Sequence, residues 1–164
     1  MTTEVSESAL PDLLATASRA IKQMNLGRMN MALTLARFDG HRVNLSAAGM
    51  PPPLVFRQQT SAVEEVELVG TPLGSMAEAT YHQWSSDLAP GDTVLLMTDG
   101  FPELLNVDGE PMGYERVRDR FAAVAGEAPE DITRSLADSA ARWATSATLN
   151  DDITFLVLRA KRCA

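Results

Sequence analysis

The sequence predicts an α+β domain in which layers of antiparallel strands and helices enclose the core, and three observations support this. Apolar residues recur with helical spacing near the N-terminus, with a spacing of two over about residues 29–47, and as a continuous run at residues 94–97. The chain has 164 residues, 45% of them apolar, which is enough for one domain with a sizeable core. We therefore expect residues 1–164 to form a single domain.

The first predicted element is a helix over about residues 10–24. Ser6 or Ser8 is a candidate N-cap, Pro11 is tolerated in the first turn, and Asn25 and Gly27 are expected to end the helix. Its apolar face consists of Leu10, Leu13, Leu14, Ala17, Ile21 and Met24.

Strands follow the helix. The alternation over residues 29–47 is interrupted at Asp39-Gly40, and Asp-Gly between two alternating runs predicts a β-hairpin. Three prolines at 51–53 favour an extended segment that leads into a strand at 54–56. Further strands are predicted over residues 63–69 and 80–85.

The second half predicts a strand at 94–97 after a turn at 89–92, then a short helical piece around 103–105 and a turn at 108–109. Helices are expected from about residue 113 and from residue 129, and a last strand over 153–158. Together these elements complete the α+β pattern.

Composition excludes several classes of function. The net charge of −8 argues against binding to nucleic acid or to an anionic membrane surface. The N-terminus lacks the features of a signal peptide, and no apolar run approaches the ~20 residues of a membrane span. The single cysteine, Cys163, excludes an internal disulfide and a cysteine-ligated zinc site. We therefore expect a soluble, cytoplasmic protein.

Acidic residues lie at the ends of two predicted buried strands. Asp99 follows the strand at 94–97, with Gly100 allowing a sharp turn, and Asp151 and Asp152 precede the strand at 153–158. If these strands are antiparallel neighbours, the carboxylates converge and form a site for Mg²⁺ or Mn²⁺, which favour oxygen ligands. Such a site suits hydrolysis of a phosphate ester. The same residues are also typical of turns whose side chains bond local amides, and residue types alone leave both interpretations open.

Several segments resemble the SpoIIE/RsbU branch of the PPM (phosphatase 2C-like) family. The Thr98-Asp99-Gly100 and Asp151-Asp152-Ile153-Thr154 segments are the most specific in combination. The resemblance spans nearly the whole chain, and the segments that carry it are residues 48–54, 72–74, 88–100 and 150–154.

The resemblance implies an α-β-β-α layered sandwich and two Mn²⁺ or Mg²⁺ ions that activate a water. That water would hydrolyse phosphoserine or phosphothreonine on a bacterial regulatory protein of the anti-sigma-factor antagonist type. Asp99 and Asp151 carry over as catalytic metal ligands. Gly100 and Asp152 complete the implied metal set, and Asp152 is alternatively a residue that bonds backbone or an outer water.

The sequence departs from the family pattern in two ways. The family's N-terminal Gly-Asp motif and a second glycine-rich acidic motif have no counterpart here, and Met50 stands where the family usually has His. We therefore expect a sandwich that is incomplete at its N-terminus, with fewer metal ions or none, weak activity, and self-association through exposed sheet surface. The alternative function is a catalytically inactive binding or assembly module.

Two Asp-Gly pairs are interpreted as turns rather than as metal motifs. Asp39-Gly40-His41 lies at the predicted hairpin turn, and Asp108-Gly109 lacks the spacing of a calcium loop.

Overall fold

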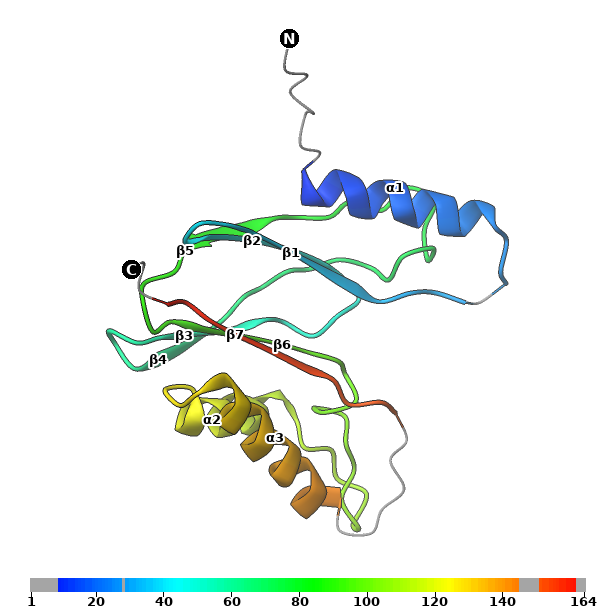
Figure 1. Ribbon diagram of the computed structural model, residues 1–164. Coiled ribbons are helices and arrows are strands. Elements are labelled where there is room, and N and C mark those ends of the chain that lie inside the picture. Colours follow the sequence, from blue (N-terminus) through cyan, green and yellow to red (C-terminus); the bar gives the residue numbers. More distant parts are fainter. Residues whose placement is uncertain (1–8, 28, 145–150, 162–164) are drawn as a thin grey trace. The chain divides into compact units, whose positions relative to one another are not determined.

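The computed structural model describes residues 9–27, 29–144 and 151–161 (Figure 1). The chain divides into two units, each described by itself below: Met1–Met50 with Leu68–Asp87, and Pro51–Glu67 with Leu88–Ala164. The prediction that residues 1–164 form one domain stays a prediction. Within the ranges that the structure describes, no helix is both long and apolar enough to cross a membrane.

The first unit is a helix packed on a three-stranded antiparallel sheet. Helix α1 (Leu10–Gln23) lies along one face of a sheet of order β1-β2-β5, formed by β1 (Leu33–Asp39), β2 (Arg42–Ala48) and β5 (Trp84–Asp87) (Figure 1). The buried side chains between helix and sheet are Leu14, Ala48, Leu73 and Tyr81.

The ends of α1 and the hairpin follow the sequence closely. The helix begins after Ala9, carries Pro11 in its first turn and ends at Gln23, with Asn25 and Gly27 at positive φ beyond it. The predicted caps Ser6 and Ser8 lie outside the described residues. The hairpin turn is confirmed, with Asp39 paired to Arg42 and Gly40 at a φ of 57°.

The second unit is a four-stranded antiparallel sheet with two helices on one face. The sheet order is β4-β3-β6-β7, formed by β3 (Leu54–Arg57), β4 (Ala62–Glu65), β6 (Thr93–Met97) and β7 (Phe155–Arg159). Helices α2 (Tyr114–Val124) and α3 (Pro129–Ala144) cover one face of this sheet (Figure 1). The largest fully buried side chains of its core are Phe101, Phe121, Leu54, Leu95, Met112, Ile132 and Leu136.

Four predicted element boundaries were wrong. The first strand begins at Leu33 rather than near residue 29, because Met31 makes only an isolated bridge to Leu73. The strand expected over 63–69 ends at Glu65, since the chain leaves the second unit after Glu67. The strand expected over 80–85 is Trp84–Asp87, the stretch that pairs with Arg42–Leu45 of β2. Residues 103–105 are not helical: Glu103 ends a turn, and Leu105 makes an isolated bridge to Pro111.

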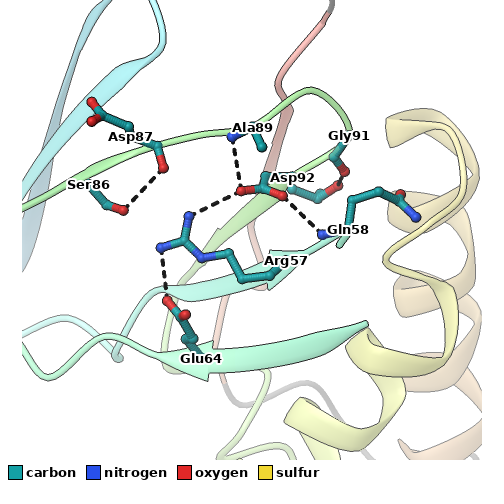
Figure 2. A network of polar contacts seen from close by, with 9 residues as sticks. Arg57, Gln58, Glu64, Ser86, Asp87, Ala89, Gly91 and Asp92 are labelled. Atoms are coloured by element: carbon teal, nitrogen blue, oxygen red, sulfur yellow. Dashed lines mark hydrogen bonds and ion pairs between the residues drawn. The ribbon is translucent and has the colours of Figure 1, made fainter. Parts of the chain in front are cut away.

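A buried carboxylate fixes the start of β6 (Figure 2). Asp92 is 2% exposed and accepts hydrogen bonds from the backbone N–H of Gln58 (2.9 Å) and of Ala89 (3.1 Å) and from Arg57 Nη1 (3.1 Å). The Arg57 guanidinium also pairs with Glu64 at 2.9 Å, and this hydrogen bond is the main cause that raises the pKa of Arg57. Strands β3, β4 and β6 are thereby tied together by charge-assisted bonds, which hold β6 in register.

Candidate functional site

Strands β6 and β7 are antiparallel neighbours, as the site prediction requires. Their register pairs Thr93 with Arg159 and Met97 with Phe155. The C-terminal end of β6 therefore lies beside the beginning of β7. The backbone of Gly100 accordingly lies against residues Asp151 and Asp152.

Thr98 joins the two strand ends through its side chain. Its hydroxyl donates to the carbonyl oxygen of Asp152 at 2.9 Å and accepts the backbone N–H of Thr154 at 3.0 Å. Its own N–H donates to the Thr154 carbonyl at 3.2 Å. These three bonds continue the β6–β7 pairing past the last ladder residue and set the position of the acidic segments on both sides.

Gly100 makes the close approach possible. It is buried, and a Cβ at this position would lie 2.5 Å from the carbonyl oxygen of Asp152. The turn that follows is closed by the N–H of Glu103, which donates to the Asp99 carbonyl at 3.0 Å. Next to it, Phe101 is fully buried and packs edge-on against Phe155, with ring centroids 4.8 Å apart. The glycine is thus required by the neighbouring backbone rather than by its own dihedral angles.

The end of β6 and the beginning of β7, with Asp99, Gly100, Asp151 and Asp152, form what we call the candidate metal edge. Its carboxylates are at least partly exposed to solvent. Asp151 and Asp152 are exposed and Asp99 is half-buried. The Asp151 carboxylate accepts the backbone N–H of Asp152 at 2.7 Å, which is the local backbone bond that the turn interpretation expects. The donor chemistry fits Mg²⁺ or Mn²⁺, which bind through one or two carboxylates and keep several waters. In the part of the chain that the structure describes, however, no three His, Cys, Asp or Glu side chains gather as a metal-binding group.

A pocket of about 430 Å³ adjoins this edge. Its lining consists of Gly100, Glu103, Leu104, Leu105, Pro111 and Asp151. Nearby, the pKa of Tyr114 is raised by partial burial, by Glu103 and Asp99, and by Glu65. The shift indicates a negative potential around Asp99 and Glu103.

The two Asp-Gly pairs that the sequence analysis interpreted as turns lie in turns. Asp39-Gly40 is the hairpin turn, and Asp108-Gly109 lies in a turn held by Asn106, whose side-chain oxygen accepts the N–H groups of Asp108 (3.0 Å) and Glu110 (2.8 Å). Asn150 and Cys163 lie outside the described residues. Sequence reasoning missed the bridging role of Thr98 and the pocket at Glu103. The signal that could have pointed to Thr98 is a polar residue directly after a buried strand.

The architecture is that of PP2C-type phosphatase domains. The SiaA-PP2C domain of Pseudomonas aeruginosa superposes with a TM-score of 0.78 at 22% identity, over 91% of this chain and 60% of that chain. The phosphatase domain of SpoIIE from Bacillus subtilis superposes with a TM-score of 0.66 at 20% identity, over 96% of this chain and 76% of that chain. At this level of identity these likenesses show the fold, and they confirm the predicted α+β PPM class.

Comparison of the sequence identifies the family to which the chain belongs. The family described as Stage II sporulation protein E (SpoIIE) matches residues 2–161, and the chain belongs to this family. It is similar to phosphoserine phosphatase RsbU of Bacillus subtilis, with 25% identity over 154 residues. That match covers 91% of this chain and 44% of RsbU, so the chain spans less than half the length of this relative. The predicted SpoIIE/RsbU family is confirmed.

Proposed function

We propose that this chain belongs to the phosphatase domain of a metal-dependent protein serine/threonine phosphatase. Its substrate is phosphoserine or phosphothreonine on a bacterial regulatory protein of the anti-sigma-factor antagonist type. Membership of the SpoIIE family and similarity to a phosphoserine phosphatase support this reaction. The single cysteine supports a cytoplasmic location.

The observation that carries the proposal is the juxtaposition of the Asp99–Gly100 turn with Asp151 and Asp152 across the β6–β7 pair. Both acidic segments flank paired strands of the hydrogen-bonded sheet, and their side chains are half-buried at Asp99 and exposed at Asp151 and Asp152. Phosphate esters in water can therefore reach them. A rigid sheet edge that presents carboxylates is suited to holding a cation next to a phosphate.

Each residue has a distinct part in the proposed site. Asp99 and Asp151 would hold Mn²⁺ or Mg²⁺ through their carboxylates, and the main chain at Gly100 lies close enough to Asp151–Asp152 to belong to the same site. A cation bound there would lower the pKa of water and offset charge on the phosphate. Thr98 holds the two acidic segments together, and Asp152 contributes its backbone to that link. The exposed side chain of Asp152 would either join the metal ligands or bond a water in the outer shell of the cation.

One observation favours a second candidate function, a binding or assembly module without turnover. Among the described residues no group of three or more potential ligands is present, and two carboxylates alone bind a divalent cation weakly. A chain of this kind would recognise a phosphorylated partner without hydrolysing it.

The deciding experiment measures phosphate release from para-nitrophenyl phosphate and from a phosphoserine peptide, with and without Mn²⁺. The enzyme proposal expects Mn²⁺-dependent release that falls at least about tenfold in Asp99→Asn and in Asp151→Asn, because each variant loses a ligand charge. Asp108→Asn is the matched control, since Asp108 lies in a separate exposed turn. Absence of Mn²⁺-dependent release would leave the binding module as the function. Release that survives both substitutions would show that Asp99 and Asp151 do not hold the catalytic cation.

A further inference from the structure

We propose that the pocket beside Asp151 binds a basic side chain, of lysine or arginine, that neighbours the phosphorylated residue of the substrate protein. The proposal rests on the proposed function, because it assigns a role in substrate selection to the surface next to the candidate metal edge. It extends that function by naming a sequence preference and the residue that determines it, Glu103.

The pocket has the size and walls of a side-chain site. Its volume of about 430 Å³ lies within the usual range for small-ligand pockets, roughly 300–1,000 Å³. Leu104, Leu105 and Pro111 supply apolar wall, and Gly100 adds backbone next to the candidate site. Apolar walls of this kind accommodate the methylene stem of a long side chain.

The walls are held in place by the fold. The Leu104 carbonyl accepts hydrogen bonds from Trp143 Nε1 and from the Met112 N–H, both at 2.9 Å. Leu105 and Pro111 form an antiparallel bridge, which closes the segment between them into a small hairpin. A preformed pocket loses little free energy to ordering when a ligand enters.

The charge of the pocket selects the occupant. Among the described residues that line it, the charged ones are Glu103 and Asp151, both acidic and both exposed. Because the proposed function assigns the Asp151 carboxylate to the cation, Glu103 supplies the negative charge that stays available to a substrate side chain. The negative potential that Glu103 and Asp99 exert on Tyr114 points the same way. Such a surface repels the phosphate group and acidic side chains, whereas it attracts an ammonium or guanidinium group. An apolar stem with a cationic end matches both walls and charge.

The position of the pocket determines which substrate residue enters it. Asp151 belongs both to the candidate metal edge and to the pocket lining. Since one residue of extended chain spans about 3.5 Å, a peptide whose phosphate lies at the metal edge can place only a near neighbour in the pocket. The preference is therefore expected within a few residues of the phosphorylated position.

The test compares fluorescently labelled phosphoserine peptides that carry arginine, norleucine or glutamate at the positions flanking the phosphoserine. Binding to the full 164-residue chain is measured by fluorescence anisotropy in Mn²⁺. We expect the arginine peptide to bind about fivefold more tightly than the glutamate peptide. Glu103 would form a partly exposed ion pair with the arginine, whereas it would repel the glutamate. Glu103→Lys is expected to reverse this order.

The matched control is Glu110→Lys, which changes an exposed acid of the same segment that does not line the pocket. Because each variant is judged by the ratio of two peptides, a general change in affinity cancels. Reversal in Glu103→Lys alone supports the proposal. An equal shift in both variants, preference for norleucine over arginine, or no dependence on the flanking residue overturns it. Para-nitrophenyl phosphate has no flanking residue, so its hydrolysis judges the proposed function separately.

Discussion

Thr98 and Asp152 are linked by a hydrogen bond in which the threonine hydroxyl donates to the aspartate carbonyl oxygen at 2.9 Å. Because the same hydroxyl accepts the Thr154 N–H, one side chain ties the end of β6 to the beginning of β7. The bond connects the two acidic segments of the candidate site directly. It therefore gives a way to disturb their spacing without changing either carboxylate.

Replacing this hydroxyl is expected to loosen the site. Thr98→Val keeps the shape but leaves the Asp152 carbonyl and the Thr154 N–H without this partner, and we expect a loss of about 1 kcal/mol in the free energy of unfolding. Mn²⁺ affinity should fall several-fold, since outer partners orient ligands. Urea denaturation and calorimetric titration with Mn²⁺ measure the two effects. Thr98→Ser retains the hydroxyl and should behave as wild type; equal losses in both variants would contradict a role for the bond.

Gly100→Ala is expected to destabilise the second unit by about 1–3 kcal/mol, because the new Cβ would overlap the Asp152 carbonyl oxygen and force the strand ends apart. Thermal unfolding followed by circular dichroism gives the change. The matched control is Gly126→Ala, where a Cβ meets nothing within 4 Å. If Gly100→Ala unfolds at the same temperature as Gly126→Ala and the wild type, the close approach of Gly100 to the Asp152 carbonyl does not require a glycine.

The Asp92 carboxylate is predicted to be a major stabilising group. Asp92→Asn removes the charge that the Arg57 guanidinium and two backbone N–H groups share, and we expect a cost of about 1–3 kcal/mol. Urea denaturation is the appropriate measurement, since it does not screen charge. Arg134→Gln breaks the exposed Arg134–Asp131 pair and should cost less than about 0.5 kcal/mol. Similar costs for the two variants would show that burial adds nothing to the Asp92 network.

The ionisation of Tyr114 reports on the acidic surface. Its folded-state pKa is raised above the ordinary value of 10.0, chiefly by burial and then by Glu103 and Asp99. Folding therefore favours the neutral phenol, and this contribution to stability is complete below pH 10.0 and is lost as the pH rises through the folded-state pKa. Asp99→Asn and Glu103→Gln should each lower that pKa, as measured from phenolate absorbance.

The chain has two tyrosines, so Tyr114→Phe identifies the signal that belongs to Tyr114. Asp108→Asn serves as the charge control, because Asp108 is not among the groups that raise this pKa. A Tyr114 pKa that is unmoved by the first two variants, or moved equally by the control, would refute the local negative potential.

Local sequence signals predicted the elements that depend on neighbouring residues. The Pro11 start, the Asp39-Gly40 turn, the Gly113 start and the Pro129 start all appear in the structure, because each rests on backbone geometry within a few residues. The pairing of β6 with β7 was only a condition of the site prediction, and the structure meets this condition.

Features that depend on distant contacts were not predictable in the same way. The bounds of β4 and β5 follow from where their partners β3 and β2 offer pairing, at Ala62–Glu65 and at Trp84–Asp87. One wall of the pocket is held by a distant contact, since Trp143 Nε1 donates to the Leu104 carbonyl. Nothing in the local pattern of residues 103–111 encodes that partner. The metal roles of Asp99, Gly100, Asp151 and Asp152 stay predictions.

The β6–β7 pairing also has a consequence for the order of events in folding. Helices α2 and α3 both lie between the two strands in sequence, so the Asp99–Gly100 turn comes beside Asp151 and Asp152 only after a long loop has closed. The candidate cation site is therefore absent from early, locally ordered states, and a cation that binds there would stabilise the finished second unit by mass action without accelerating the steps that lead to it.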